Sequence, residues 1–176
     1  MTATAATPNL AGHVTPTGRS RSRSWPAYAA AVAAFSFAAT SFYFAAGGMT
    51  GVGTLGGKIE ELAHTRPPAF VAVVWFTAVL KVALGMLALA LVRQWGRKLP
   101  RRWVLRAAWL CAGVLALYGA VQVTGVALAT LGIATTSSSH SVLLWRLLLW
   151  EPWFLVWGLL LGLAAWQARK RPEPVR

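Results

Sequence analysis

Two charged residues, Lys81 and Glu151, stand inside long apolar stretches and are the first candidates for chemistry. A charge at bilayer depth costs at least about 2.5–3.5 kcal/mol, so such residues usually face the interior of a helix bundle and often mark a functional site. Small side chains at helical spacing from Lys81, which are Thr77, Ala78 and Gly85, predict a face that packs against other helices. We therefore expect Lys81 to point into the bundle.

Heights along the membrane axis bring further polar residues to the same level. At a rise of about 1.5 Å per residue, the Lys81 ammonium and Glu151 both fall about 22–24 Å above the cytoplasmic boundary. We predict a polar layer in the outer half of the bundle, with Lys81 and Glu151 as its ion pair. The candidate members of this layer are Ser41, Tyr43, Lys81, Tyr118, Gln122, Arg146 and Glu151.

Each charge also has a simpler interpretation that needs no functional site. The Lys81 side chain could extend to the membrane surface, and Glu151 could be a hydrated helix cap. Arg146, near the outer surface, could contact either a lipid phosphate or Glu151. Four tryptophans around the last span predict an aromatic belt at the membrane interface, with a hydrophobic ligand slot as the alternative. They are Trp145, Trp150, Trp153 and Trp157.

Several chemistries lack the residues that they need. Cys111 is the only cysteine, so the chain has no internal disulfide and no cysteine-based metal or redox motif. The histidines fall in polar segments without ligand spacing, which argues against haem or zinc between the spans; they are His13, His64 and His140. The scarcity of acids argues against metal-dependent phosphate chemistry; they are Glu60, Glu61, Glu151 and Glu173. We expect no cofactor and no metal.

One glycine-rich segment resembles a nucleotide-binding fingerprint in its spacing alone. Gly51, Gly53 and Gly56 match G-x-G-x-x-G, but a dinucleotide site needs a strand before this motif and a helix after it. This segment follows an apolar helix instead. A phosphate-binding loop would need glycine and a hydroxyl residue where the chain has Val52 and Ile59. We interpret the segment as a flexible loop that leaves the first span.

Hydropathy predicts the elements that must position these residues. Hydrophobic residues make up 57% of the chain and charged residues 12%, about half the charged fraction of a soluble domain. Four apolar stretches are long enough to cross a hydrocarbon core of about 30 Å. They run over about 26–46, 69–92, 103–131 and 152–168. The prediction is an all-α fold, an integral membrane four-helix bundle over residues 25–168.

The last apolar stretch contains an interruption at Glu151 and Pro152. Proline lacks a backbone donor and is best tolerated in the first turn of a helix. We therefore expect the fourth span to begin at Pro152, after a separate interfacial helix over 142–150. One continuous kinked helix over 142–167 is the alternative.

The basic residues predict the orientation of the bundle. Lysine and arginine concentrate in the arm 1–24, in the loop between the second and third spans, and in the tail 169–176. An excess of these residues marks cytoplasmic segments, so we expect both termini in the cytoplasm and a multi-pass protein of the cell membrane. The polar arm 1–24 is expected to be disordered. The net charge of +13 flanks apolar spans, so the expected partner is the lipid bilayer and not nucleic acid.

Short motifs at the span ends are similar to those of a known family. The first span ends in Tyr43-Phe-Ala-Ala-Gly-Gly48, an arginine-rich second loop follows later, and the last span opens with Trp150-Glu-Pro-Trp153-Phe. Through these segments, residues 27–168 resemble a bacterial family of small four-span membrane proteins known only as a domain of unknown function (DUF3995-like). The resemblance implies a four-helix membrane bundle and transfers no catalytic residues.

Three functions are compatible with this sequence. The leading hypothesis is a non-enzymatic structural or accessory bundle, with a lipid or another membrane protein as partner and its oligomeric state left open. The alternative is a small transporter or carrier that uses the polar layer around Lys81 and Glu151. The third is a membrane enzyme that acts on a lipid or isoprenoid, with Glu151 as the acid or base.

Overall fold

The computed structural model describes residues 24–133 and 140–170, which form helices and turns without any strand among them. Four helices in this part of the chain are long and apolar enough to cross a membrane. They are α1 (Trp25–Ala45), α3 (Pro68–Ala90), α4 (Arg101–Thr130) and the helical run His140–Arg169. The predicted all-α fold with four spans is thus confirmed. The arm before Ser24 and the tail after Lys170, with their expected disorder, lie outside the described residues.

Three short elements connect the spans. The 3-10 turn η1 (Val52–Thr54) and the helix α2 (Gly57–Thr65) follow α1, and the 3-10 helix η2 (Gln94–Lys98) follows α3. The glycine motif thus surrounds η1 and is preceded by α1, as a loop that leaves the first span would be. No strand precedes the motif in the described chain, so it lacks the structural context of a dinucleotide fingerprint.

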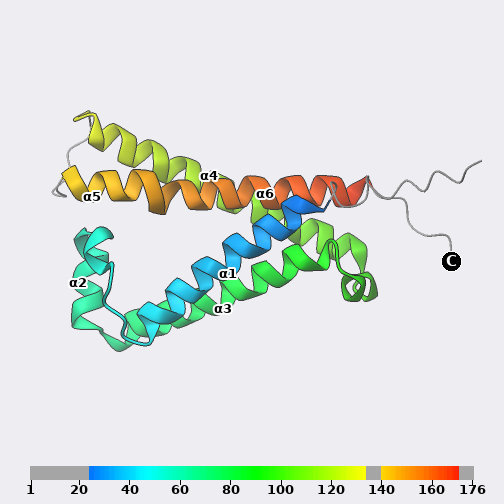
Figure 1. Ribbon diagram of the computed structural model, residues 1–176, viewed down its shortest axis with the longest axis horizontal. Helices are drawn as coiled ribbons and strands as arrows, with labels where there is room; N and C mark the ends of the chain where they lie inside the picture. The colour runs from blue at the N-terminus through cyan, green and yellow to red at the C-terminus, as the bar shows by residue number, and fades with distance from the viewer. Residues whose placement is uncertain (1–23, 134–139, 171–176) are drawn as a thin grey trace, which may run out of the picture.

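The helices pack as two antiparallel pairs. Helix α1 lies along α3, α4 lies along the C-terminal helix α6 (Glu151–Arg169), and α1 also contacts α6 and so joins the pairs. Figure 1 shows the pairs close together where α6 ends and farther apart where α2 lies. We call these two ends of the bundle the basic end and the α2 end. The described cations of the basic end are Arg93, Arg97, Lys98, Arg101, Arg102, Arg106, Arg169 and Lys170.

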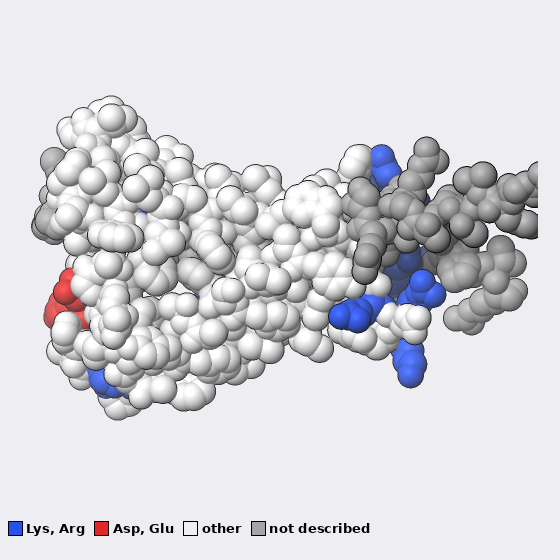
Figure 2. Space-filling view, viewed as in Figure 1, with Lys and Arg blue, Asp and Glu red and all other residues white. Residues whose placement is uncertain are grey.

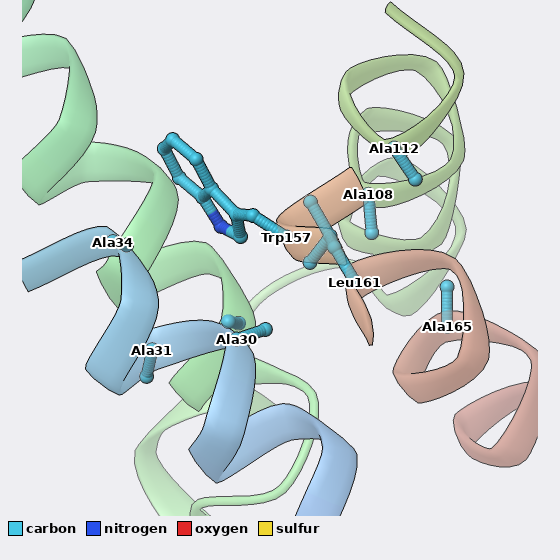
Figure 3. Close-up of a cluster of buried hydrophobic side chains, with 9 residues drawn as sticks. Ala30, Ala31, Ala34, Ala108, Ala112, Trp157, Leu161 and Ala165 are labelled. Atoms are coloured by element: carbon cyan, nitrogen blue, oxygen red, sulfur yellow. The ribbon is translucent and has the colours of Figure 1, made fainter. Parts of the chain in front are cut away.

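The core between the pairs consists mainly of alanine. Figure 3 shows the ring of Trp157, which is 1% exposed, reaching from α6 toward the alanines of α1. Leu161 and alanines of all four spans complete this cluster; they are Ala30, Ala31, Ala34, Ala88, Ala108, Ala112 and Ala165. Small side chains let membrane helices approach closely, which replaces the hydrophobic driving force that lipid does not supply.

The α4–α6 contact is close enough to require glycine. A Cβ atom added to Gly119 would lie 2.3 Å from the backbone nitrogen of Leu155. A Cβ atom added to Gly158 would lie 2.5 Å from the backbone nitrogen of Ala116. Because the obstructing atoms belong to the backbone, no side-chain rotation could make room. These two glycines fix the distance between α4 and α6.

The last span is one continuous helical run with a wide turn inside it. The helix α5 (His140–Trp145) passes through a π-helical turn, η3 (Arg146–Trp150), into α6 without leaving the right-handed helical conformation. Pro152 therefore lies within the helical run and does not begin it. The structure differs here from the expected break before Pro152 and corresponds to the alternative of one continuous helix. A π turn immediately before the proline provides room for its ring and for its missing donor.

Arginine side chains close two helix ends that would otherwise expose unpaired carbonyls. Arg66, which has a positive φ of 46° after α2, donates from Nη1 to the Phe44 carbonyl at 3.1 Å and from Nη2 to the Ala45 carbonyl at 2.8 Å. At the basic end, the Arg101 guanidinium donates to the Ala168 carbonyl. A cation at a helix C-terminus also interacts favourably with the helix dipole. The two arginines therefore fix the ends of α1 and α6.

Candidate functional site

Glu151 is the one buried charged side chain in the described part of the protein, with 5% of its surface exposed. Its Oε1 atom accepts hydrogen bonds from Arg146 Nε at 2.9 Å and Nη2 at 2.6 Å. Its Oε2 atom accepts a longer bond from Gln122 Nε2 of α4 at 3.4 Å. Both carboxylate oxygens are therefore engaged by donors, one from the same helical run and one from the neighbouring helix.

The π turn is what brings Arg146 to Glu151. In a regular α-helix, residues five positions apart point about 140° away from each other. A π turn instead closes hydrogen bonds between residues five apart, and here the Glu151 amide donates to the Arg146 carbonyl. The two side chains consequently lie on one face. The unusual backbone thus has a direct electrostatic result, the neutralisation of a buried acid.

Lys81 has different partners from those expected. Its Nζ atom donates to Ser41 Oγ of α1 at 3.0 Å and lies 5.4 Å from the centre of the Phe37 ring. The predicted ion pair between Lys81 and Glu151 is therefore not formed. Two physical reasons account for this: Arg146 reaches the carboxylate from the same helical run, and aromatic rings occupy the space between α1 and α6.

These rings form what we call the aromatic cluster, which consists of Phe37, Trp150, Trp153 and Phe154. The Phe37 ring centre lies 5.8 Å from that of Trp150, 5.9 Å from that of Trp153 and 5.0 Å from that of Phe154. Such spacings are typical of favourable edge-to-face and offset stacking. Phe37 therefore contacts the Lys81 ammonium on one side and the rings of the last span on the other.

The tryptophans of the last span mostly face the protein, unlike the belt expected from sequence. Trp150 Nε1 donates to Thr54 Oγ1 of η1 at 3.1 Å, and Trp153 Nε1 donates to the Ala33 carbonyl at 3.4 Å. Trp157 is buried in the alanine core, and Trp145 alone among the four is largely exposed. The indoles therefore connect the two helix pairs from the α2 end down to the core.

The remaining candidates of the polar layer lie at its margins. Tyr118 of α4 packs its ring edge-on against Phe154 at 5.1 Å and is half-exposed. The Tyr43 hydroxyl accepts a hydrogen bond from the Thr50 backbone N–H at 3.2 Å, and its ring lies under Gly48. The structure thus places five of the seven candidates in two charged clusters, Lys81 with Ser41 and Glu151 with Arg146 and Gln122. Of the other two, Tyr118 packs against Phe154 and Tyr43 makes a loop contact.

Phe37 and Thr54 were not among the candidates, although they join these clusters. Phe37 is one apolar residue among many in an apolar helix, so the sequence does not distinguish it. Thr54 and Trp150 are 96 residues apart along the chain, so the sequence does not indicate that they meet. The pairing of Arg146 and Glu151 was one of the two alternatives drawn from the sequence for Arg146, and it had one further signal. A proline directly after the acid made a regular helix unfavourable there, and a π turn would align residues five apart.

Donor groups for a metal are sparse in the same region. Across residues 24–133 and 140–170, no three histidine, cysteine, aspartate or glutamate side chains come together. The polar groups of the two clusters are two cations, one hydroxyl, one amide and one carboxylate, a set that suits the binding of an anion better than the binding of a cation.

Comparison with known protein families gives a match over most of the chain. A family model described as "Protein of unknown function (DUF3995)" matches residues 34–161. No curated protein and no solved structure matches the chain. The matched segment contains both charged clusters and the aromatic cluster, and the description gives no role to any of their residues.

Proposed function

Since the chain belongs to the DUF3995 family, for which no function is described, we propose a role from its own geometry: a non-enzymatic structural or accessory bundle of the cell membrane. Four apolar helices support the membrane location. The observation that carries the role is the engagement of Glu151, the acid on which an enzymatic function would depend. A general acid or base must exchange a proton with a substrate within hydrogen-bond reach. Here both carboxylate oxygens already accept hydrogen bonds from Arg146 or Gln122, and the side chain is buried.

The surroundings of Glu151 support a structural interpretation. Gln122 extends from α4 to the carboxylate, while Arg146 and Glu151 belong to the last span, so the cluster joins these two helices. The same helices are in backbone contact at Gly119 and Gly158. The Gln122 contact also favours one register between α4 and the last span, because a shifted register would leave the second oxygen of a buried carboxylate without its donor. The polar groups around Glu151 thus hold α4 and the last span in one arrangement.

Lipid analysis of cells that normally express the protein tests this proposal. If the protein is not a lipid enzyme, deleting it should leave the set of membrane lipid species unchanged in mass spectrometry of total extracts. A strain carrying Glu151→Gln at normal protein level is the matched comparison. A lipid species that accumulates both in the deletion strain and in the Glu151→Gln strain would identify an enzyme substrate and refute the non-enzymatic role.

The orientation that we propose places both termini in the cytoplasm. Figure 2 supports it, because most of the visible Lys and Arg gather at the basic end, whereas the opposite end shows acids together with a smaller basic patch. Among the described residues of the α2 end, Glu60, Glu61 and Glu151 offset Lys58, Arg66 and Arg146. A concentration of lysine and arginine in short loops favours cytoplasmic retention of that end.

Reporter fusions after Glu61 and after Arg97 are expected to give opposite results. The first position follows α1 at the α2 end, and the second lies in η2 at the basic end. Alkaline phosphatase, which requires export for activity, should be active after Glu61 and inactive after Arg97. A cytoplasmic reporter at the same two positions provides the control and should show the reverse pattern. Equal activity at both positions would contradict the four-span topology.

A carrier of small anions or lipids is the second candidate, and one observation favours it. Lys81 is a cation inside the bundle that contacts a hydroxyl and a ring but no described acid. Intramembrane cations of this kind often line the path of an anionic substrate. Reconstitution into liposomes, with Lys81→Met as comparison, would reveal protein-dependent movement of a labelled anion if the carrier function is correct.

A further inference from the structure

The charges inside the bundle do not balance. The whole chain has 4 acidic residues against 17 lysines and arginines. Three acids are described: Glu61 pairs with Lys58 on the surface, Glu151 pairs with Arg146, and Glu60 lies on α2, outside the four spans. The charged groups of the two clusters are therefore two cations, Lys81 and Arg146, and one anion, Glu151. An uncompensated charge away from water is costly, so a bound counter-anion would stabilise the structure.

The Lys81 ammonium lies nearer the α2 end of the bundle than the backbone of Lys81 does. Its Cα is 13 residues from the first residue of α3, Pro68. A helical side chain leans toward the N-terminus of its helix, which for α3 is the α2 end. Its acceptor, Ser41, stands 4 residues before the end of α1 at Ala45, a distance of about 6 Å along the axis. The ammonium therefore lies about one helical turn below the end of α1.

The groups around this ammonium match a phosphate with a hydrocarbon tail. Ser41 Oγ accepts from Lys81, which leaves its own O–H available to donate to a second oxygen. Lys81 is half-buried, and the adjacent Leu80 is exposed on the lipid-facing side of α3. Phe37 provides an apolar ring directly beside the charge. One excess positive charge corresponds to one monoanionic phosphodiester.

We propose that Lys81 and Ser41 bind the phosphate of one anionic phospholipid from the membrane leaflet at the α2 end, with hydrocarbon against Phe37. The lipid neutralises the excess charge of the polar groups. A zwitterionic lipid would bring its own ammonium and would leave the charge excess unchanged. This site goes beyond the structural role proposed above and does not depend on it, since binding requires neither catalysis nor transport.

Photocrosslinking with two lipids of equal acyl chains tests the site. The full chain is reconstituted in nanodiscs that contain either phosphatidylglycerol or phosphatidylcholine with a photoreactive group near the glycerol. Crosslinked peptides are then identified by mass spectrometry. Phosphatidylglycerol should label the peptides that contain Ser41 and Lys81 at least tenfold more than phosphatidylcholine does. Lys81→Met should reduce this labelling to the phosphatidylcholine level, Ser41→Ala should reduce it severalfold, and Lys81→Arg should retain it.

Two controls separate this site from general attraction of anionic lipid. Labelling of the arginine-rich segment 97–106 should be the same in all variants and shows that each is folded and embedded. Lys58→Met, which removes a lysine of the same end that is already paired with Glu61, should leave labelling at Lys81 unchanged. Equal labelling by both lipids, or labelling that survives Lys81→Met, would overturn the proposal. Loss of the labelling on addition of millimolar inorganic phosphate would also overturn it, because the ligand would then be a free anion.

Discussion

Replacing Arg146 by methionine is expected to lower the free energy of unfolding of the detergent-solubilised protein by about 3–5 kcal/mol. The substitution retains most of the apolar volume and removes the cation that contacts Glu151 Oε1 at 2.6 Å. Glu151 is then left buried with only the distant Gln122 amide as a donor. Thermal or denaturant unfolding of the purified protein, followed by circular dichroism, provides the measurement.

Replacing the partner, Glu151, by glutamine should lower the free energy of unfolding by less, because Arg146 is more exposed than Glu151. The Arg146 side chain is 29% exposed, so after Glu151→Gln its guanidinium can turn toward the lipid headgroups. We expect a loss of about 1.5–3 kcal/mol, the range for hydrogen bonds to charged groups.

The double variant Arg146→Met with Glu151→Gln should recover much of the loss. By contrast, Lys81→Met and Glu151→Gln should be additive, since these side chains do not contact each other. Additive losses for Arg146 and Glu151 would show that their contact contributes nothing.

Gly158→Ala is expected to destabilise the bundle by about 1–3 kcal/mol, and Gly119→Ala by a similar amount. Each added methyl group would overlap backbone of the opposite helix, at 2.5 Å from the Ala116 nitrogen or 2.3 Å from the Leu155 nitrogen. Relief requires α4 and α6 to move apart, which also lengthens the bond between Gln122 and Glu151. Larger substitutions such as Gly158→Leu should prevent the native packing altogether.

Two other glycines of α4 are matched controls for this effect. A Cβ atom at Gly113 or Gly125 would meet no atom within 4 Å. Alanine at these positions should therefore leave stability unchanged or raise it slightly, because alanine favours helix over glycine. The comparison holds the residue change and the helix constant and varies only the contact. Equal effects at Gly113 and Gly119 would mean that helix propensity, and not close packing, determines the result.

Hydropathy was sufficient to predict the spans, because lipid imposes a strict requirement. Every backbone polar group in the hydrocarbon region must be paired within the segment, so long apolar stretches have little choice but to form helices. The last span was harder, since Pro152 opposes a regular helix and the sequence allowed either a break or a distortion. The energetic balance between these outcomes depends on packing against α4, which a single helix does not reveal.

The sequence predicted the positions of the candidate residues along the bundle axis, but not which side chains point toward one another. Residue counting correctly brought Lys81, Ser41 and Glu151 toward the same end of the bundle, since the rise per residue is constant. Which side chains meet depends on how each helix is rotated and which rings lie between them. Phe37 and the indole of Trp153 separate Lys81 from the last span, and a stacked pair of this kind leaves no periodic mark in the sequence. The surroundings of Lys81 therefore required the three-dimensional arrangement, whereas the contact between Arg146 and Glu151 was one of two alternatives drawn from the sequence.

The π turn also sets the phase of the whole last span. Leu143 and Glu151 are both buried, yet residues eight positions apart would differ by about 80° in a regular helix. One additional residue in the wide turn removes about 100° of rotation and brings the two within about 20° of each other. The turn therefore behaves as an inserted residue that keeps one inward-facing stripe along the 30 residues of this run. An alignment of related chains that assumed a uniform period would assign the residues before Arg146 to the wrong side of the helix.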